Sequence, residues 1–595
     1  MRRKEKKELT TSLQKVVDRV FAMASDEHKK MTESYDRFAG HIWKEEELRK
    51  KDSRAFINYE FVTVETIAPL LTDNPPICKV LPKHGYLEKL AWVYNNALKY
   101  GWQTMDMARK TMLAVMDAMI AKIGIFKTYY NYEEDRLETE VVDPRNFFTL
   151  PGYDDLWKSP MCGTREPVPV TYIKQRWPDV KEITVDQSHF DDEKKSKVKF
   201  GDSEDHENMM RYAQLYSVWM KDESVEEVLN EEGKKIGEKV TYPYGKMVYF
   251  LSDQLLAVEP VPSGTKYPPF VPLYDYERPH NFLGISESDQ IRGLNKELNL
   301  MLQHITGHIR KYHDPNYEVD VNCFQDPQTI KSQLQEGGGN VFMADKSMDP
   351  TRQGIRVIEE PGVSADVTNF FTVLPNIIET ITGNVDILQG EPAKKERQSA
   401  SEIAIQYEAA NTRTRQRIRN LEWTIKRLGY LWVSIMQQEY SGQREFYTFD
   451  PETGEPVYER IGNSRAFAET MVRSPKTAEA MRGQKQLNPD QQREQQDYEK
   501  LVKAFGKDTD KVFFDFDIII ETNSTLPMDK QSRANMAMRL FEIGAIDHQA
   551  LLEVLQWPNA HEIVARITQQ MQEGAPPPQG GGNTTPFMRP GEGNV

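Results

Sequence analysis

The helical pattern between residues 401 and 440 constrains the fold more than any other stretch of the chain. It opens at Ser399-Ala-Ser-Glu402, where a serine and a glutamate three residues apart form a capping box. About 40 residues of helix would extend roughly 60 Å at 1.5 Å per residue, whereas the mean globular helix has about 11–12 residues. A helix of this length needs a large partner surface, and we expect that one chain alone does not supply it.

A second helix is predicted from Ser286, which is a serine N-cap with Asp289 three residues on. Apolar residues recur in both helices at intervals of three and four. In the first they are Ile291, Leu294, Leu298, Met301 and Ile305; in the second they are Ile418, Leu421, Ile425, Leu428, Trp432 and Ile435. This spacing is typical of a seam that packs against another helix, and we expect both seams to contribute to packing between subunits.

The remaining pattern predicts an α+β fold that is mainly helical. Helices precede an antiparallel sheet over residues 212–261, and two phenylalanines fall in a predicted loop over 144–151. A small α+β insert follows the first seam helix, and then a helix that Pro375 should kink or break. The predicted boundaries are 1–285, 286–311, 312–363, 364–388, 389–400, 401–440, 441–528, 529–572 and a disordered glycine- and proline-rich tail over 573–595.

Length and charge limit the class of protein. A chain of 595 residues is long enough for two to four domains. Its formal charge of −15 argues against a protein that grips nucleic acid over its whole surface. A net negative charge would suit the wall of a channel through which DNA slides, because repulsion prevents adhesion. It would suit an ordinary acidic protein equally well. Three scattered cysteines favour a reducing compartment, and no apolar run approaches the length of a membrane span.

Known catalytic motifs are missing from the sequence. No phosphate-binding loop is present, because the Gly-Lys pairs lack the upstream glycine. His304 and His308 have the spacing of metal ligands on a helix but lack a third ligand, so packed or solvated histidines are the simpler interpretation. Asp515 and Asp517 would share one face of a strand, with nothing nearby to complete a two-metal nuclease site. We therefore expect no enzyme activity, no metal and no cofactor.

Several segments, in this order, resemble the portal proteins of tailed bacteriophages. The central ones are GISESDQIRGLNKELN from residue 284 and NVDILQGEPAKKERQSASEIAIQYEAANTRTRQRIRNLEW from residue 384. Further likeness lies in VDPRNFFTLPGYDDLWKSPMCGTREPVPVTYIKQRWP, PFVPLYDY and TLPMDKQSRANMAMRLFEIGAIDHQALLEVLQWP. The likeness covers roughly residues 20 to 572. The resemblance rests on the order of these segments along the chain, because no single motif is specific to the family.

The resemblance implies a portal fold with wing, stem, clip and crown regions. In this sequence the wing would take residues 1–285, the stem helix 286–311, the clip 312–363 and the returning stem helix 364–388. A tunnel loop would take 389–400, a long wing helix 401–440, the wing return 441–528 and the helical crown 529–572.

The same resemblance places basic residues in a DNA channel. The tunnel loop would present Lys394, Lys395, Arg397 and Gln398 to phosphates, in contacts that are independent of base sequence and weakened by salt. An ordinary helix-helix turn with solvated charges is the alternative. Arg310 and Lys311 would form a basic ring at the channel exit, or simply compensate a helix dipole. Arg413, Arg415, Arg417 and Arg419 would contact phosphates or pair with acidic neighbours between subunits.

The expected function is that of a portal subunit in the virion, assembled in the host cytoplasm. A ring of about twelve copies would form at one capsid vertex, the channel for genome packaging and ejection. Expected partners are double-stranded DNA, the terminase large subunit, head-to-tail adaptors, and capsid and scaffolding proteins, with no membrane. The alternatives are a DNA-acting soluble enzyme and another structural adaptor of the virion.

Overall fold

The structure, a computed structural model, describes most of the chain up to residue 440 and short pieces beyond it. Described are residues 3–41, 43, 55–73, 76–83, 88–180, 183, 212–222, 224–229, 235–242, 244–252, 254–261, 267–313, 316–336, 340–345, 354–358, 365–382, 400–440, 444–449, 456–461 and 516–520, with isolated positions between 537 and 563. The chain divides into two compact units, residues 1–444 with 460–525, and residues 445–459 with 526–595.

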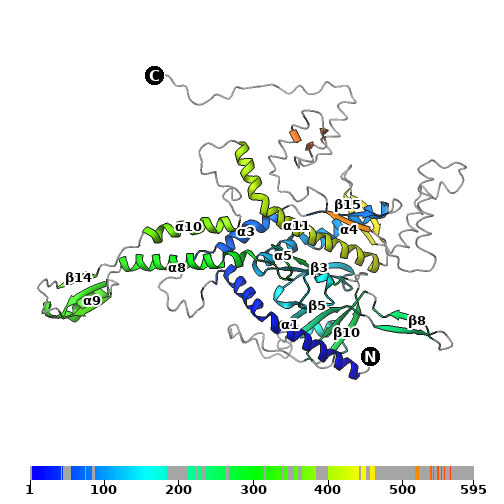
Figure 1. The fold of residues 1–595 in the computed structure, drawn as a ribbon, viewed down its shortest axis with the longest axis horizontal. Helices are drawn as coiled ribbons and strands as arrows, with labels where there is room; N and C mark the ends of the chain where they lie inside the picture. The colour runs from blue at the N-terminus through cyan, green and yellow to red at the C-terminus, as the bar shows by residue number, and fades with distance from the viewer. Residues whose placement is uncertain are drawn as a thin grey trace, which may run out of the picture. The chain divides into compact units, whose positions relative to one another are not determined.

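The helices of the first unit follow the predicted order (Figure 1). They are α1 (Arg3–Phe38), α3 (Tyr59–Thr72), α4 (Glu88–Thr104), α5 (Met107–Ala121), α6 (Val170–Arg176), α8 (Glu287–His313), α9 (Pro327–Glu336), α10 (Ala365–Thr382) and α11 (Ala400–Glu439). The long helix predicted over 401–440 is α11, and the helix predicted from Ser286 is α8. Because α8 carries glycine and many polar residues, its stability depends on tertiary contacts more than on intrinsic propensity.

Two antiparallel sheets form the body of this unit. The larger has the strand order β10 (Leu255–Pro260), β9 (Lys246–Phe250), β6 (Tyr212–Met220), β5 (Met161–Pro169) and β4 (Phe147–Thr149). The smaller has the order β11 (Phe270–Leu273), β2 (Gly124–Asn131) and β3 (Arg136–Val142). The predicted antiparallel sheet over 212–261 is therefore confirmed for β6, β9 and β10.

Smaller strand pairs complete the described structure. Strand β1 (Cys78–Pro82) pairs with β17 (Phe516–Ile520), and β7 (Val225–Leu229) pairs with β8 (Lys235–Val240), both antiparallel. A further two-stranded sheet joins β15 (Arg444–Phe449) and β16 (Pro456–Ile461). None of the described helices is long and apolar enough to cross a membrane.

The apolar core lies between the two sheets and on both outer faces. Between the sheets, Ile125 and Phe270 of the smaller sheet meet Trp219 and Met247 of the larger one. On the other face of the larger sheet, α1 packs through a row that includes Val17. Helices α5 and α11 contact the smaller sheet. The layers are thus α5 and α11, the smaller sheet, the larger sheet, and α1 (Figure 1).

The predicted loop over residues 144–151 is wrong in part, because it contains strand β4. Phe147 and Phe148 are both buried, and they contribute to two different apolar clusters. Phe147 joins the core between the sheets, whereas Phe148 packs with Phe21 of α1. Adjacent residues of a strand point to opposite faces, so two consecutive apolar residues here belong to a strand that is covered on both sides.

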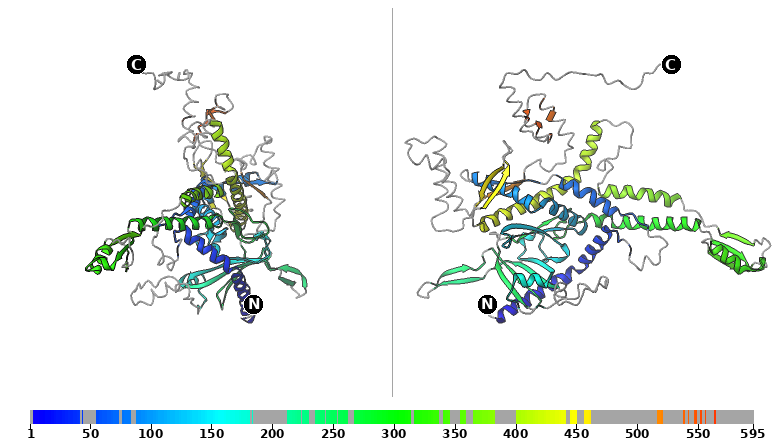
Figure 2. Two further views of the ribbon diagram at one scale, coloured as in Figure 1. Left: turned by 60° about the vertical axis from the view of Figure 1, so that its left-hand side comes forward. Right: turned by 180° about the vertical axis from the view of Figure 1, so that it is seen from behind.

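The residues after α8 form a small separate sheet at the end of two helices. Strand β12 (Asn316–Asp320) lies between β13 (Val341–Ala344), with which it is parallel, and β14 (Ile355–Ile358), with which it is antiparallel. Helix α9 contacts β12. Figures 1 and 2 show α8 and α10 running side by side, with this small sheet beyond them. Helix α10 is continuous through Pro375, so the predicted break does not occur.

We predict that Gly124→Ala lowers the melting temperature of the protein. A Cβ atom at position 124 would lie 2.2 Å from the backbone carbonyl oxygen of Ala114. Relief requires α5 to move away from β2, and overpacking of this kind costs about 1–3 kcal/mol. The matched control is Gly293→Ala in α8, where an added Cβ meets nothing within 4 Å. It should leave the melting temperature unchanged or raise it, since alanine is favoured by up to about 1 kcal/mol in a helix. Equal behaviour of the two variants in thermal unfolding would contradict the packing described.

Candidate functional site

The first turn of α8 is a polar site at which side chains from several helices meet. Ser286 caps the helix, because its Oγ accepts a hydrogen bond from the backbone N–H of Asp289 at 3.2 Å. Glu287 and Asp289 place negative charge at the positive end of the helix dipole. Ser286, Glu287 and Ser288 are all buried. We call residues 286–289, together with the basic residues that meet them, the stem anchor.

Arg417 of α11 binds the first of these residues. Its Nη2 pairs with the carboxylate of Glu287 and donates to the hydroxyl of Tyr276. The Tyr276 hydroxyl in turn donates to Glu287 Oε1 at 3.1 Å, and the guanidinium carbon lies 4.8 Å from the centre of the Tyr276 ring. Arg417 Nε also lies 3.0 Å from Asp275 Oδ1, as an ion pair whose angle does not make a hydrogen bond.

Buried charges of opposite sign make the Arg417 contacts strong and costly to break. Burial raises the pKa of Asp275 to about 6, and the charge of Arg417 acts in the opposite direction. Two carboxylates therefore depend on one guanidinium in a place that water does not reach. Removal of one partner from such a buried pair usually costs about 3–5 kcal/mol.

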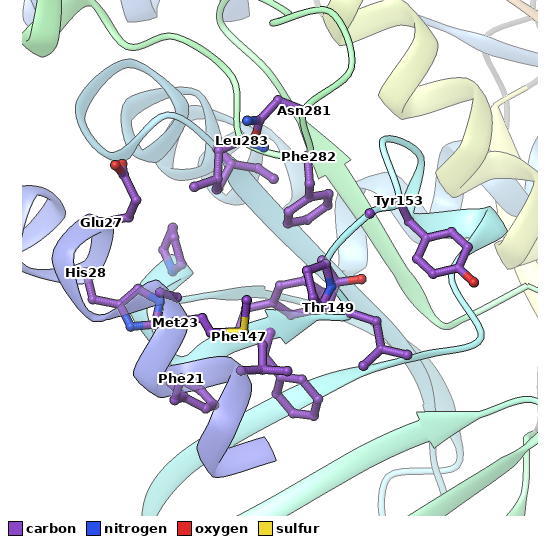
Figure 3. Close-up of a pocket in the computed structure, with 18 of the residues that line it drawn as sticks. Phe21, Met23, Glu27, His28, Phe147, Thr149, Tyr153, Asn281, Phe282 and Leu283 are labelled. Atoms are coloured by element: carbon purple, nitrogen blue, oxygen red, sulfur yellow. Dashed lines mark hydrogen bonds between the residues drawn. The ribbon is translucent and has the colours of Figure 1, made fainter. Parts of the chain in front are cut away.

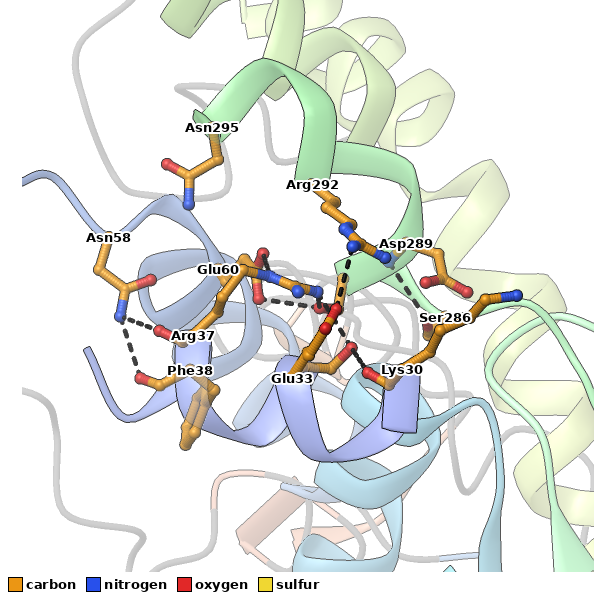
Figure 4. A network of polar contacts seen from close by, with 12 residues as sticks. Lys30, Glu33, Arg37, Phe38, Asn58, Glu60, Ser286, Asp289, Arg292 and Asn295 are labelled. Carbon is orange, nitrogen blue, oxygen red and sulfur yellow. Dashed lines mark hydrogen bonds and ion pairs between the residues drawn. The ribbon is translucent and has the colours of Figure 1, made fainter. Parts of the chain in front are cut away.

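Arg37 of α1 binds the next residue. Its Nη2 donates to Ser288 Oγ at 3.1 Å, and its Nε donates to Glu60 Oε1 of α3 at 2.7 Å. Ser288 Oγ donates to the other oxygen of Glu60 at 2.8 Å, which closes a ring of three side chains. Burial raises the pKa of Glu60, although Arg37 and Ser288 act to lower it. Figure 4 shows α1, α3 and α8 joined at this point.

Lys122, the C-cap residue of α5, binds the last residue of the turn. Its Nζ lies 3.0 Å from Asp289 Oδ2 and 2.6 Å from Glu27 Oε2 of α1. Burial acts to lower the pKa of Lys122, but the two carboxylates raise it overall. Lys122 has a φ of 76°, a left-handed conformation that usually belongs to glycine. The two ion pairs stabilise a backbone conformation that its sequence does not favour.

Further contacts continue the attachment along α8. Arg292 pairs with Glu33 of α1 at 3.0 Å, as Figure 4 shows. One helical turn on from Asn295, the amide of Asn299 bonds both backbone groups of Ile57, at 2.7 Å and 2.9 Å. Helices α1, α3, α5 and α11 therefore all hold the same end of α8. This arrangement fixes the start of α8 to the sheet body.

A cavity of about 550 Å³ with both apolar and polar lining lies beside the anchor, between α1 and the two sheets. Figure 3 shows Phe21, Met23 and His28 of α1 facing Phe147 and Phe282 across it. Burial lowers the pKa of His28, and the nearby charge of Arg165 acts in the same direction. Polar residues also line this cavity, and one of them, Glu27, already pairs with Lys122.

The predicted DNA-channel residues Lys394, Lys395, Arg397 and Gln398 lie outside the described residues. Arg310 and Lys311 lie in the last turns of α8, where the backbone alone is described. The prediction for the channel loop and the exit ring therefore stays a prediction. Residues 529–572, the predicted crown, are described only at isolated positions, and the predicted tail lies outside the described residues.

The seam of α11 needs a correction. Ile418, Leu421, Ile425, Leu428 and Trp432 are only 0–4 % exposed within the single chain. Trp432 Nε1 donates to Thr139 of β3 at 2.9 Å, and the helix covers the smaller sheet and the β1–β17 pair. These side chains have no surface left for a neighbouring subunit. The reason is that the sheets of the same chain supply the large partner surface that the helix needs.

The seam of α8 divides into two kinds of residue. Ile291 and Leu298 are buried within the chain, whereas Leu294, Met301 and Ile305 are partly exposed. Arg417 needs a correction as well: it is buried in an ion pair within its own chain, so it meets neither phosphate nor another subunit. The spacing of arginines along α11 could not distinguish it from Arg419, which is exposed.

The stem anchor was missed by the sequence-based reasoning except for its capping residues. Ser286 and Asp289 gave a local signal, whereas Arg37, Lys122 and Arg417 come from distant segments without a shared motif. No group of three or more potential metal ligands occurs within the described ranges. Asp517 lies on β17 opposite Leu81, and Asp515 lies outside the described residues.

Comparison with protein families decides the identity of the fold. The family model described as phage P22-like portal protein matches residues 14–586, nearly the whole chain. The chain belongs to this family of phage portal proteins. No curated protein matches it. The predicted resemblance is confirmed.

Membership makes the chain a structural component of the phage. Portal proteins are a structural, non-enzymatic class, and the family implies an oligomeric ring at a capsid vertex that associates with capsid and terminase. The stem anchor is then the place in a portal protein where α8 is joined to α11, the helix that covers the smaller sheet.

We predict that Arg417→Met destabilises the protein by about 3–5 kcal/mol at pH 8, because it leaves Asp275 and Glu287 buried without a cation. The pKa of Asp275 is already raised, and loss of Arg417 raises it further. A carboxyl whose pKa is higher in the folded state than its value of about 4 in the unfolded state stabilises the folded state fully only below about pH 4. This stabilisation is lost as the pH rises through the pKa of the folded state. The loss in the variant should therefore be largest above about pH 6 and shrink towards pH 4.

The measurement is thermal unfolding of the wild type and the variant at about pH 4.5 and about pH 8, which lie on either side of the pH at which Asp275 loses its proton. The control is Arg419→Met, which removes an exposed arginine two residues along the same helix and should change stability by no more than about 0.5 kcal/mol. Equal losses at both pH values would show that the charge of Arg417 does not matter.

Proposed function

We propose that this portal protein forms a ring, with about twelve copies, at one vertex of the capsid. The ring is the channel for genome packaging and ejection, and the platform for the terminase motor and then for head-to-tail connectors. Family membership supports the proposal. The structural observation that carries it is an apolar row on α10 that its own chain leaves uncovered.

This row consists of Phe370, Val373 and Ile377, which are 46 %, 46 % and 37 % exposed. Leu374 and Ile378, on the adjacent face of the same helix, are each 1 % exposed. Helix α10 packs against α8 in the chain, so α10 is apolar over a wider arc than that one partner covers. Rows of this kind on soluble proteins mark protein–protein interfaces.

The proposed occupant of the α10 row is the next copy of the chain. A heterologous contact, in which one surface meets a different surface of the next subunit, closes into a ring when the rotation permits. The partly exposed residues Leu294, Met301 and Ile305 of α8 give the neighbouring copy an apolar surface of matching kind. The buried seam of α11 has no part in this contact.

The proposed channel contacts are electrostatic and independent of base sequence. Lys394, Lys395 and Arg397, with Gln398, are the residues proposed to touch phosphates, while Arg310 and Lys311 form the proposed basic ring at the exit. The formal charge of −15 limits adhesion elsewhere on the surface. The loop joins α10 to α11, whose Arg417 is fixed in the stem anchor, so a force on the loop would reach the base of α8 directly.

Replacement of Phe370, Val373 and Ile377 by serine should prevent ring formation while the chain stays folded. The row is partly exposed in the single chain, so its loss removes apolar surface and disturbs far less packing than loss of the buried Leu374 or Ile378 would. Light scattering and electron microscopy measure the assembly, and circular dichroism measures the fold. Leu113→Ser, an equally exposed apolar position on α5 at 45 %, is the control. Rings of normal size and yield in the triple variant would refute the proposed interface.

Neutralisation of Lys394, Lys395 and Arg397 by glutamine should leave ring assembly intact and impair DNA packaging or retention. Three phosphate contacts per subunit would be lost, which weakens the grip on DNA in a salt-dependent way. Packaged genome length and the yield of filled heads are the measurements. A control with the same charge change replaces the exposed Lys15, Arg19 and Lys29 of α1. Normal genome length and a normal yield of filled heads in the loop variant would contradict the proposed contact between the loop and DNA.

A further inference from the structure

A second cavity, of about 630 Å³, lies between the two sheets at the end that the apolar core does not fill. Three neighbouring strands of the larger sheet place Glu166, Ser217 and Tyr249 along its wall. Ser217 of β6 lies directly opposite Tyr249 of β9, and Glu166 of β5 lies one diagonal step away from Ser217. Diagonal neighbours on one face of a sheet are about 7–8 Å apart, so the three side chains can reach one ligand.

The other wall comes from the smaller sheet and from α6. Lys127 and Glu140 lie directly opposite each other on β2 and β3, and the Tyr129 hydroxyl donates to Glu140 at 2.6 Å. Arg176 of α6 lies 4.0 Å from Glu259 and 4.9 Å from the centre of the Tyr249 ring. Lys127 is thus the cross-strand neighbour of Glu140, and Arg176 lies beside Glu259.

Glu166 is left without a counter-charge in this cavity. Within the described part of the chain it forms no ion pair and no side-chain hydrogen bond, although it is partly buried. The hydroxyl of Ser217, a buried residue, likewise has no hydrogen-bond partner among the described residues. Glu166 is only partly buried, and a carboxylate in such a place attracts a counter-charge more strongly than one in open water does, because less solvent screens the pair. The lining holds three carboxylates, those of Glu140, Glu166 and Glu259, against two cations, Lys127 and Arg176, so it has one carboxylate in excess.

Aromatic rings determine which kind of cation would fit. Tyr129, Tyr172 and Tyr249 line the space, and the faces of tyrosine rings attract organic cations. A bare metal ion would need several oxygen ligands, whereas the described residues hold no group of three or more potential metal ligands. An ammonium on an aliphatic chain instead uses one carboxylate, one hydroxyl and the apolar side of the rings.

We propose that this inter-sheet cavity binds a primary alkylammonium group, with Glu166 as its counter-charge and Ser217 as a hydrogen-bond acceptor. The aliphatic stem lies against the tyrosine rings and Leu215. Such a group occurs in free aliphatic amines and in the lysine side chains of other proteins. The proposal rests on the cavity alone and is independent of ring formation and of DNA contact.

The test is isothermal titration calorimetry of the full chain with two probes, 1,4-diaminobutane and Nα-acetyl-lysine N-methylamide. Ionic strength is kept at about 0.15 M so that long-range attraction to the acidic surface is screened. Wild-type protein should bind with a stoichiometry of one per chain. Glu166→Gln should weaken binding at least about tenfold, because a hydrogen bond to a charged group is lost. This isosteric change removes an unpaired charge, so the melting temperature should not fall.

The control variant is Glu134→Gln, which makes the same charge change at the exposed turn between β2 and β3 and should leave binding unchanged. Tighter binding of the diamine would identify a free amine as the ligand class, and tighter binding of the lysine derivative would identify a lysine side chain of a partner. Absence of binding for both probes, or equal weakening by Glu134→Gln, would overturn the proposal.

Discussion

The structure depends on the meeting of three basic residues with one turn of helix. Arg417, Arg37 and Lys122 come from α11, α1 and the end of α5, and they bind Glu287, Ser288 and Asp289 in order. Each contact alone is an ordinary ion pair or hydrogen bond. Because they share one turn, α8 cannot tilt or slide without separating several charges from their partners at once, and the partners of Arg417 and Arg37 lie where water does not replace them.

This constraint explains how a long excursion of the chain can leave the sheet body and return to it. The small sheet of β12, β13 and β14, helix α10 and the loop that follows all come after the anchored turn in the sequence. Arg417 then brings the chain back to the same turn. Within this segment, Leu374 and Ile378 of α10 are buried by the chain itself, whereas Phe370, Val373 and Ile377 of the same helix form an apolar row that stays partly exposed. Attachment to the body and the proposed attachment to the next copy thus use different residues.

Local sequence signals predicted the elements well and their partners poorly. The capping residues and the three-four spacing identified α8 and α11 to within a few residues, because capping and periodicity are properties of a single segment. The same spacing could not show that Leu428 faces a sheet of its own chain. A helix that packs against a sheet of its own chain and a helix that packs against another subunit show the same three-four spacing of apolar residues. The pattern around Phe147 and Phe148 predicts a loop, because a strand that is buried on both faces shows no alternation of apolar and polar residues.

The ion pairs of the anchor were beyond prediction for a similar reason. Arg417 is one of four alternate arginines, and only the tertiary fold distinguishes this buried residue from the exposed Arg419. The role of Lys122 is still harder to predict, since the left-handed backbone conformation that it adopts at the end of α5 is usually adopted by glycine. By contrast, the order of segments along the chain was informative, and it agreed with the portal family that matches residues 14–586.

The most direct test of the account is single-particle imaging of the purified protein together with its mass in solution. The account predicts a closed ring with a central hole and a mass about twelve times that of one chain, in which α10 of each copy contacts the next copy. A particle that is a stable monomer under all assembly conditions, or a ring in which the α10 row faces solvent, would contradict it.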